Sequence, residues 1–110
     1  MQNNESTHSN NLPLACLLSA EQMAIRIDET RKVFASSQQV RELTDGYAFQ
    51  YPGEPIWAEK LLHIILEERK CCPFFSFELS FEPAEGPIWL SLRGQEGVKE
   101  IIQEQLRPNH

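Results

Sequence analysis

The chain has 110 residues, a net charge of −6 and an apolar fraction of 41%. A chain of this size buries about two thirds of the surface that it exposes when unfolded, so it can fold as one domain without disulfide bonds or a structural metal. Binding to nucleic acid or to an anionic membrane surface requires clustered lysine and arginine, and the acidic balance excludes both as expected partners. No apolar run approaches the roughly 18 residues that span a bilayer, so we expect no membrane-spanning segment.

The N-terminal residues 1–11 are almost wholly polar and predict a disordered tail, while residues 12–107 predict a single α+β domain. The segment that ends at Cys16 is superficially like a lipoprotein cleavage box. It lacks the basic start and the apolar length of a signal peptide, so we do not expect secretion. Three cysteines are an odd number and do not fit the disulfide framework of a secreted domain. The sequence therefore favours a cytoplasmic protein with free thiols.

The first predicted helix begins with a capping box at Ser19 and continues to about Ser36, with apolar residues near helical spacing. Two short strands, residues 40–44 and 47–51, then flank an Asp-Gly pair. This pair readily adopts the positive φ angles of a tight turn, so the two strands are predicted to form a hairpin.

Pro55 suits the first turn of a second helix, where its missing N–H costs nothing. The apolar stripe of this helix is wider than a surface helix needs, which indicates that the helix is largely buried or meets a partner. A residue before proline avoids helical geometry, so the helix is expected to end by Cys71, with Cys72 extended ahead of Pro73. The charged run 67–70 at its end is expected to lie in solvent.

Residues 75–81 alternate apolar and polar side chains, and residues 88–93 do the same after a turn rich in proline and glycine. Trp89 and Arg93 fall on the polar face, where an exposed tryptophan could stack on a ligand. A last amphipathic helix covers about residues 98–106. The order helix, hairpin, helix, hairpin, helix predicts a two-layer sandwich, in which a four-stranded, mainly antiparallel sheet carries three helices on one side.

The two neighbouring cysteines at the end of the second helix are the main candidates for chemistry. Neighbouring side chains diverge by about 100° on a helix and about 180° on a strand, so Cys71 and Cys72 are not expected to share one ion unless the backbone is irregular. Cys16 is a third candidate ligand, if the lead-in to the first helix crosses the end of the second. His63 shares a helix face with Glu67 and Cys71, and is a weaker candidate as a zinc ligand or as a base for the thiol.

Other interpretations of the same residues stay open. Cysteines are often buried as small apolar groups, so all three can be purely structural. The chain would then be a non-catalytic interaction or dimerisation domain that uses its apolar second helix and the polar sheet face. The sequence does not favour an enzyme, because it contains no C-x-x-C pair, no phosphate-binding loop and no pattern typical of a catalytic triad.

Residues 68–74 spell Glu-Arg-x-Cys-Cys-Pro-Phe. An alternating Phe-x-Phe-x-Leu strand at 75–79, a Gly-Pro hairpin at 86–87 and a Gly-x-x-Gly-x-Lys helix start at 94–99 follow it. In these features, over about residues 16–102, the chain resembles a group of small, mostly uncharacterised bacterial domains, some of which are companions of MerR-type metal-responsive regulators. The resemblance implies a bacterial protein whose thiols serve soft metals.

The sequence thus leads to one main functional prediction. We expect a cytoplasmic module that binds a thiophilic ion, such as zinc, mercury or copper(I), through Cys16, Cys71 and Cys72. His63 is a distant fourth ligand. The alternative is an interaction domain, such as a homodimer formed through the second helix, in which the cysteines only pack.

Overall fold

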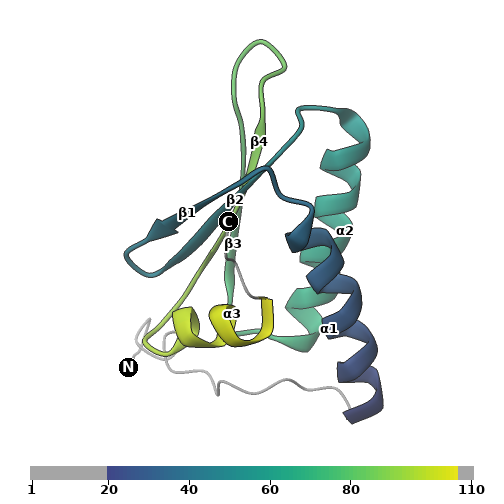
Figure 1. Ribbon diagram of the computed structural model, residues 1–110, viewed down its shortest axis with the longest axis vertical. Coiled ribbons are helices and arrows are strands. Elements are labelled where there is room, and N and C mark those ends of the chain that lie inside the picture. Colours follow the sequence, from purple (N-terminus) through teal and green to yellow (C-terminus); the bar gives the residue numbers. More distant parts are fainter. Residues whose placement is uncertain (1–19, 107–110) are drawn as a thin grey trace, which may run out of the picture.

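The computed structural model describes residues 20–106, which form three helices and a four-stranded sheet in the order α-ββ-α-ββ-α (Figure 1). The elements are α1 (Ala20–Ala35), β1 (Gln39–Leu43), β2 (Gly46–Tyr51), α2 (Pro55–Cys71), β3 (Ser76–Phe81), β4 (Ile88–Arg93) and α3 (Val98–Leu106). The predicted α+β fold is therefore confirmed. The predicted tail, the capping box at Ser19 and Cys16 lie outside the described residues. None of the three helices in the described range has the length and apolar character that spanning a bilayer requires.

The sheet has the strand order β1-β2-β4-β3, and each neighbouring pair is antiparallel. One face of the two central strands, β2 and β4, packs into the hydrophobic core. Three cross-strand pairs lie on this face, and all six side chains are almost completely buried: Tyr47 with Leu92, Phe49 with Leu90 and Tyr51 with Ile88. Side chains from all three helices pack with these pairs in one hydrophobic cluster. Because alternate strand residues point to opposite faces, the helices must all pack on this same face.

Tyr51 ties the helices to the sheet at one end of the core. Its side chain is fully buried, and its hydroxyl donates a hydrogen bond to the Val33 carbonyl at 3.0 Å. Its ring stacks on Trp57 of α2, with centroids 5.1 Å apart. One side chain of β2 thus contacts both α1 and α2, which fixes where α2 begins relative to the sheet.

The opposite face of the sheet is covered by its own charged side chains. The Arg41 guanidinium lies 4.3 Å from the centroid of the Trp89 ring, and the Trp89 indole N–H donates to the Glu82 carboxylate at 2.6 Å. Arg93 forms ion pairs with Glu78 of β3 and with Asp45 in the turn between β1 and β2. Trp89 is only 7% exposed. The expectation of an exposed Trp89 is therefore wrong, because a side chain from the neighbouring hairpin covers it.

The burial of Tyr51 makes the stability of the fold sensitive to alkaline pH. Burial raises the pKa of the phenol above its ordinary value of 10.0, because a buried phenolate would lose its hydration. When folding raises the pKa of a group, the unfolded chain loses its proton at a lower pH than the folded protein does. The stability of the fold is therefore unaffected below the unfolded pKa and falls as the pH rises above that value. We therefore expect the free energy of unfolding, measured with urea, to fall above about pH 10.

Tyr51→Phe is expected to remove this part of the alkaline slope. At neutral pH the variant should lose about 1 kcal/mol, because the Val33 carbonyl loses its hydroxyl donor. Urea titrations at pH 7 to 11 on both proteins measure the two effects. An alkaline slope that is the same with and without the Tyr51 hydroxyl would contradict the expectation.

Candidate functional site

The candidate site is the joint at which α2 ends and the chain turns toward β3. Pro73 disfavours helical geometry at the residue before it, and α2 ends at Cys71 as the sequence predicts. Cys72 has φ −128° and ψ 78°, and its N–H donates to the Glu68 carbonyl at 2.7 Å. Phe75 in turn donates its N–H to the Cys72 carbonyl at 3.4 Å. The chain therefore leaves the helix in a tight, hydrogen-bonded turn.

This turn brings the two cysteine side chains together in the protein interior. The Sγ atoms of Cys71 and Cys72 lie 3.4 Å apart, and the residues are 4% and 5% exposed. The two side chains do not diverge here, because the backbone at Cys72 is neither helical nor that of a regular strand, which is the irregular case that the sequence left open. Two thiolates on one tetrahedral zinc, with bonds of about 2.3 Å, lie about 3.8 Å apart. The observed separation is close to that value.

The two sulfurs differ in their chemical state. Cys71 is disulfide-bonded, whereas Cys72 carries a thiol. Their separation of 3.4 Å is well above the roughly 2.05 Å of a disulfide bond, so they are not bonded to each other. The expectation of free thiols is therefore wrong for Cys71, and the Cys72 sulfur lies beside an oxidised sulfur.

The other two predicted ligands are not brought to the pair within the described residues. Cys16 lies outside the described range. His63 is on the exposed side of α2, whereas Cys71 is buried at the end of that helix. Over residues 20–106, no three histidine, cysteine or acidic side chains gather as the ligands of one metal ion would. The described part of the site therefore consists of the two neighbouring sulfurs.

Glu68 belongs to the joint, although the sequence places it in a charged helix end. It is only 7% exposed, and its carboxylate accepts a hydrogen bond from the Thr30 hydroxyl at 3.0 Å. Thr30, on α1, is 2% exposed. The expectation that the whole run 67–70 lies in solvent is therefore wrong for Glu68. Glu68 lies four residues after Ile64 and three before Cys71, and both of these are buried. This helical spacing could have placed Glu68 on the inner face of α2.

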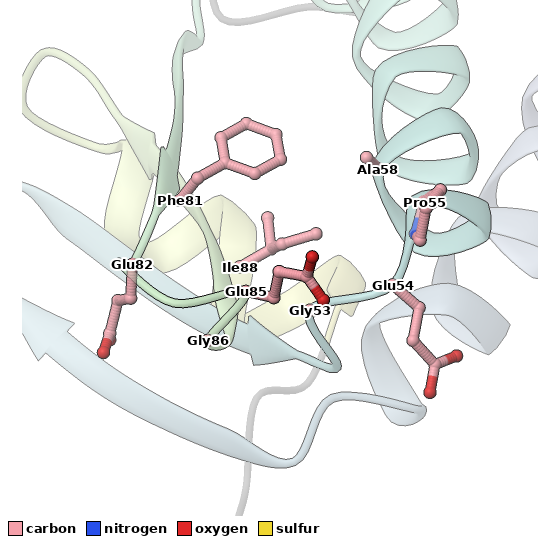
Figure 2. A pocket seen from close by; sticks show the side chains of 9 residues that line it. All are labelled: Gly53, Glu54, Pro55, Ala58, Phe81, Glu82, Glu85, Gly86 and Ile88. Carbon is pink, nitrogen blue, oxygen red and sulfur yellow. The ribbon is translucent and has the colours of Figure 1, made fainter.

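A cavity of about 380 Å³ lies near the opposite end of α2 (Figure 2). Its apolar lining includes Ala58, Phe81 and Ile88, and Figure 2 shows the Phe81 and Ile88 side chains directed toward α2. Glutamates contribute to its rim, but no cysteine or histidine lines it. Phe81 is 60% exposed. This cavity therefore offers apolar contact area and carries neither a thiol nor an imidazole.

Comparison with protein-family models, with curated proteins and with solved structures gives no match for this chain. The resemblance to small bacterial domains with the Glu-Arg-x-Cys-Cys-Pro-Phe run stays a prediction. The function has to be inferred from the geometry of the joint.

The buried bond between Thr30 and Glu68 is expected to stabilise the joint strongly. Thr30→Val keeps the shape of the side chain but removes the donor to a carboxylate, so we expect a loss of about 1.5–3 kcal/mol in the free energy of unfolding. Ser36→Ala is a matched control, because the exposed Ser36 hydroxyl donates to the Lys32 carbonyl at 2.8 Å. It should change stability by less than about 0.5 kcal/mol. Equal losses in urea titrations would show that the buried bond has no special role.

Proposed function

We propose that the protein is a small module that binds a thiophilic metal ion, such as zinc, mercury or copper(I), through the thiolates of Cys71 and Cys72. The observation that supports this most is the 3.4 Å separation of the two Sγ atoms. Soft thiolates are the ligands that such ions prefer. Because the turn already holds the sulfurs together, the second metal–sulfur bond forms with little further loss of chain entropy.

The surroundings of the pair favour binding of an ion over free thiol reactivity. The pair lies at the C-terminal end of α2, where the partial negative charge of the helix disfavours a thiolate. Both residues are also buried, which raises the cost of a bare anion. A bound cation supplies the missing positive charge. We therefore expect binding of an ion to be accompanied by release of protons.

Binding requires that Cys71 first be reduced. A sulfur in a disulfide has no thiolate to donate, so the oxidised form of Cys71 and metal ligation exclude each other. The proposed binding thus needs a reducing compartment, which agrees with a cytoplasmic location. Cys16 completes the proposed set of ligands, with His63 as the weaker candidate.

Native mass spectrometry of the reduced protein tests the proposal. With one equivalent of Zn(II) or Hg(II) under anaerobic conditions, the intact protein should carry one ion. Cys71→Ser and Cys72→Ser should each lose the zinc adduct, Cys16→Ser should weaken it, and His63→Gln should change it least. Protein that has not been reduced should bind no zinc. A wild-type protein that binds no more zinc than the Cys71→Ser/Cys72→Ser double variant would rule the proposal out.

A second candidate function, an interaction or dimerisation domain, is favoured by the surface of α2. Ile56, Leu62 and Leu66 are 58%, 49% and 48% exposed, although large apolar side chains on a helix are usually buried. Leu62 and Leu66 are four residues apart and so lie on the same face of α2. A contiguous exposed apolar patch of this kind marks contact with a partner. Light scattering on the wild type and on Leu62→Glu tests it. If two copies associate through α2, the charge added by Leu62→Glu should weaken that association. An equal degree of association in both proteins would argue against α2 as the contact.

A further inference from the structure

We propose that the free edge of β3 pairs antiparallel with β3 of a second copy of this chain, so that two four-stranded sheets become one. In the described part of the chain, β3 hydrogen-bonds to β4 on one side and has no neighbouring strand on the other. β1 is the second edge of the sheet. The free edge of β3 contains neither the cysteines nor the exposed apolar side chains of α2.

The ladder between β3 and β4 determines which backbone groups of β3 are left for a partner. The Glu82 N–H donates to the Pro87 carbonyl at 3.1 Å, one step beyond the last paired residues of the ladder. Directly bonded pairs alternate with unbonded pairs along an antiparallel ladder, so the even-numbered residues of β3 bond to β4. Phe77, Leu79 and Phe81 therefore direct their N–H and C=O groups toward the free edge.

The other side of β4 gives an independent check of this alternation. The Gly94 N–H donates to the Asp45 carbonyl at 3.1 Å, one step beyond the ladder between β4 and β2. The same alternation then assigns the even-numbered residues of β4 to β2 and the odd-numbered ones to β3. Both ladders agree.

The two edges of the sheet differ in their protection against pairing. β1 carries Arg41 and Glu42, and Lys99 of α3 forms an ion pair with Glu42. Charged side chains of this kind are a common protection of edge strands. β3 carries one charged side chain, Glu78, which pairs with Arg93 of the neighbouring strand. It has no lysine, arginine or proline, and its register with β4 is unbroken over all six residues. β3 is therefore the edge that is open to a partner strand.

Apolar contacts favour one arrangement of two β3 strands. Only the odd-numbered residues of β3 direct their N–H and C=O groups toward the free edge. In a pair of β3 strands, odd-numbered residues must therefore lie opposite odd-numbered residues. A two-fold axis at Leu79 places Leu79 opposite itself and Phe77 opposite Phe81 of the second copy. Phe81 is 60% exposed beside the cavity of Figure 2. The phenyl ring of Phe77 from the second copy would then cover apolar surface that water now contacts.

Charge excludes the neighbouring registers. With the axis at Leu79, Glu78 lies opposite Ser80 of the second copy on the polar face. A shift of two residues in one direction places Glu78 opposite Glu78, and a shift in the other direction places Glu78 opposite Glu82. Like charges directly opposite each other destabilise a strand pair. Of these three registers, the one with the axis at Leu79 is the one that places no glutamate opposite another glutamate.

Substitutions at Ser80 test both the contact and its register. Ser80 is exposed on the open face of the sheet. Ser80→Glu places two glutamates opposite Glu78 across the axis, and should raise the dissociation constant of the dimer about two- to thirty-fold. Ser80→Lys should lower it by a similar factor. Gln39→Glu and Gln39→Lys make the same charge changes on an exposed residue of β1 and should have little effect. Sedimentation velocity over a concentration series measures all five proteins.

The outcomes separate the alternatives. A protein that stays monomeric up to millimolar concentration overturns the proposal, and so does a dimer that responds equally to charges at residues 39 and 80. A dimer that Leu62→Glu breaks and that is indifferent to residue 80 assigns the contact to α2, which overturns it as well. Zinc binding by the cysteine pair, in the turn before β3, is measured separately and can fail or succeed independently.

Discussion

The structure depends on the backbone geometry that Pro73 imposes on Cys72. The proline prevents α2 from continuing, yet the Cys72 N–H still reaches the Glu68 carbonyl. The chain thus leaves the helix within one residue, and the two sulfurs meet at 3.4 Å. The same Glu68 accepts a hydrogen bond from Thr30, which holds α1 against the joint. If α2 continued through Cys72, neighbouring helical side chains would diverge and the two sulfurs would separate. A shift of β3 by one residue in its register with β4 would also turn its apolar face to solvent.

The elements and their order could be predicted from the sequence because each has a regular apolar period and clear ends. Pro55 marks the start of α2, and Pro73 marks its end. The alternation of Phe77 and Leu79 with polar residues defines β3 and its inner face. These patterns are local, so one sequence suffices to find them. The layering follows from the requirement that every apolar face be covered.

The details of the candidate site could not be predicted, because they depend on contacts between distant residues. The sequence indicates that Glu68 belongs to a charged helix end. Only the fold brings Thr30, 38 positions earlier, into hydrogen-bond contact with it. Trp89 reads as exposed until Arg41 from the other hairpin covers its ring. The separation of the two sulfurs depends on the dihedral angles at Cys72, which no spacing rule supplies. The sequence thus identifies the cysteine pair but not its geometry.

The two proposals use different parts of the molecule: the buried turn before β3 for a soft ion, and the free edge of β3 for a second copy. The central claim is that both sulfurs of the turn bind the same ion. X-ray absorption at the zinc edge tests it most directly, on reduced protein loaded with one equivalent of Zn(II). We predict a first coordination shell with at least two sulfur atoms at about 2.3 Å. A shell of nitrogen and oxygen alone, or one with a single sulfur, would contradict the claim.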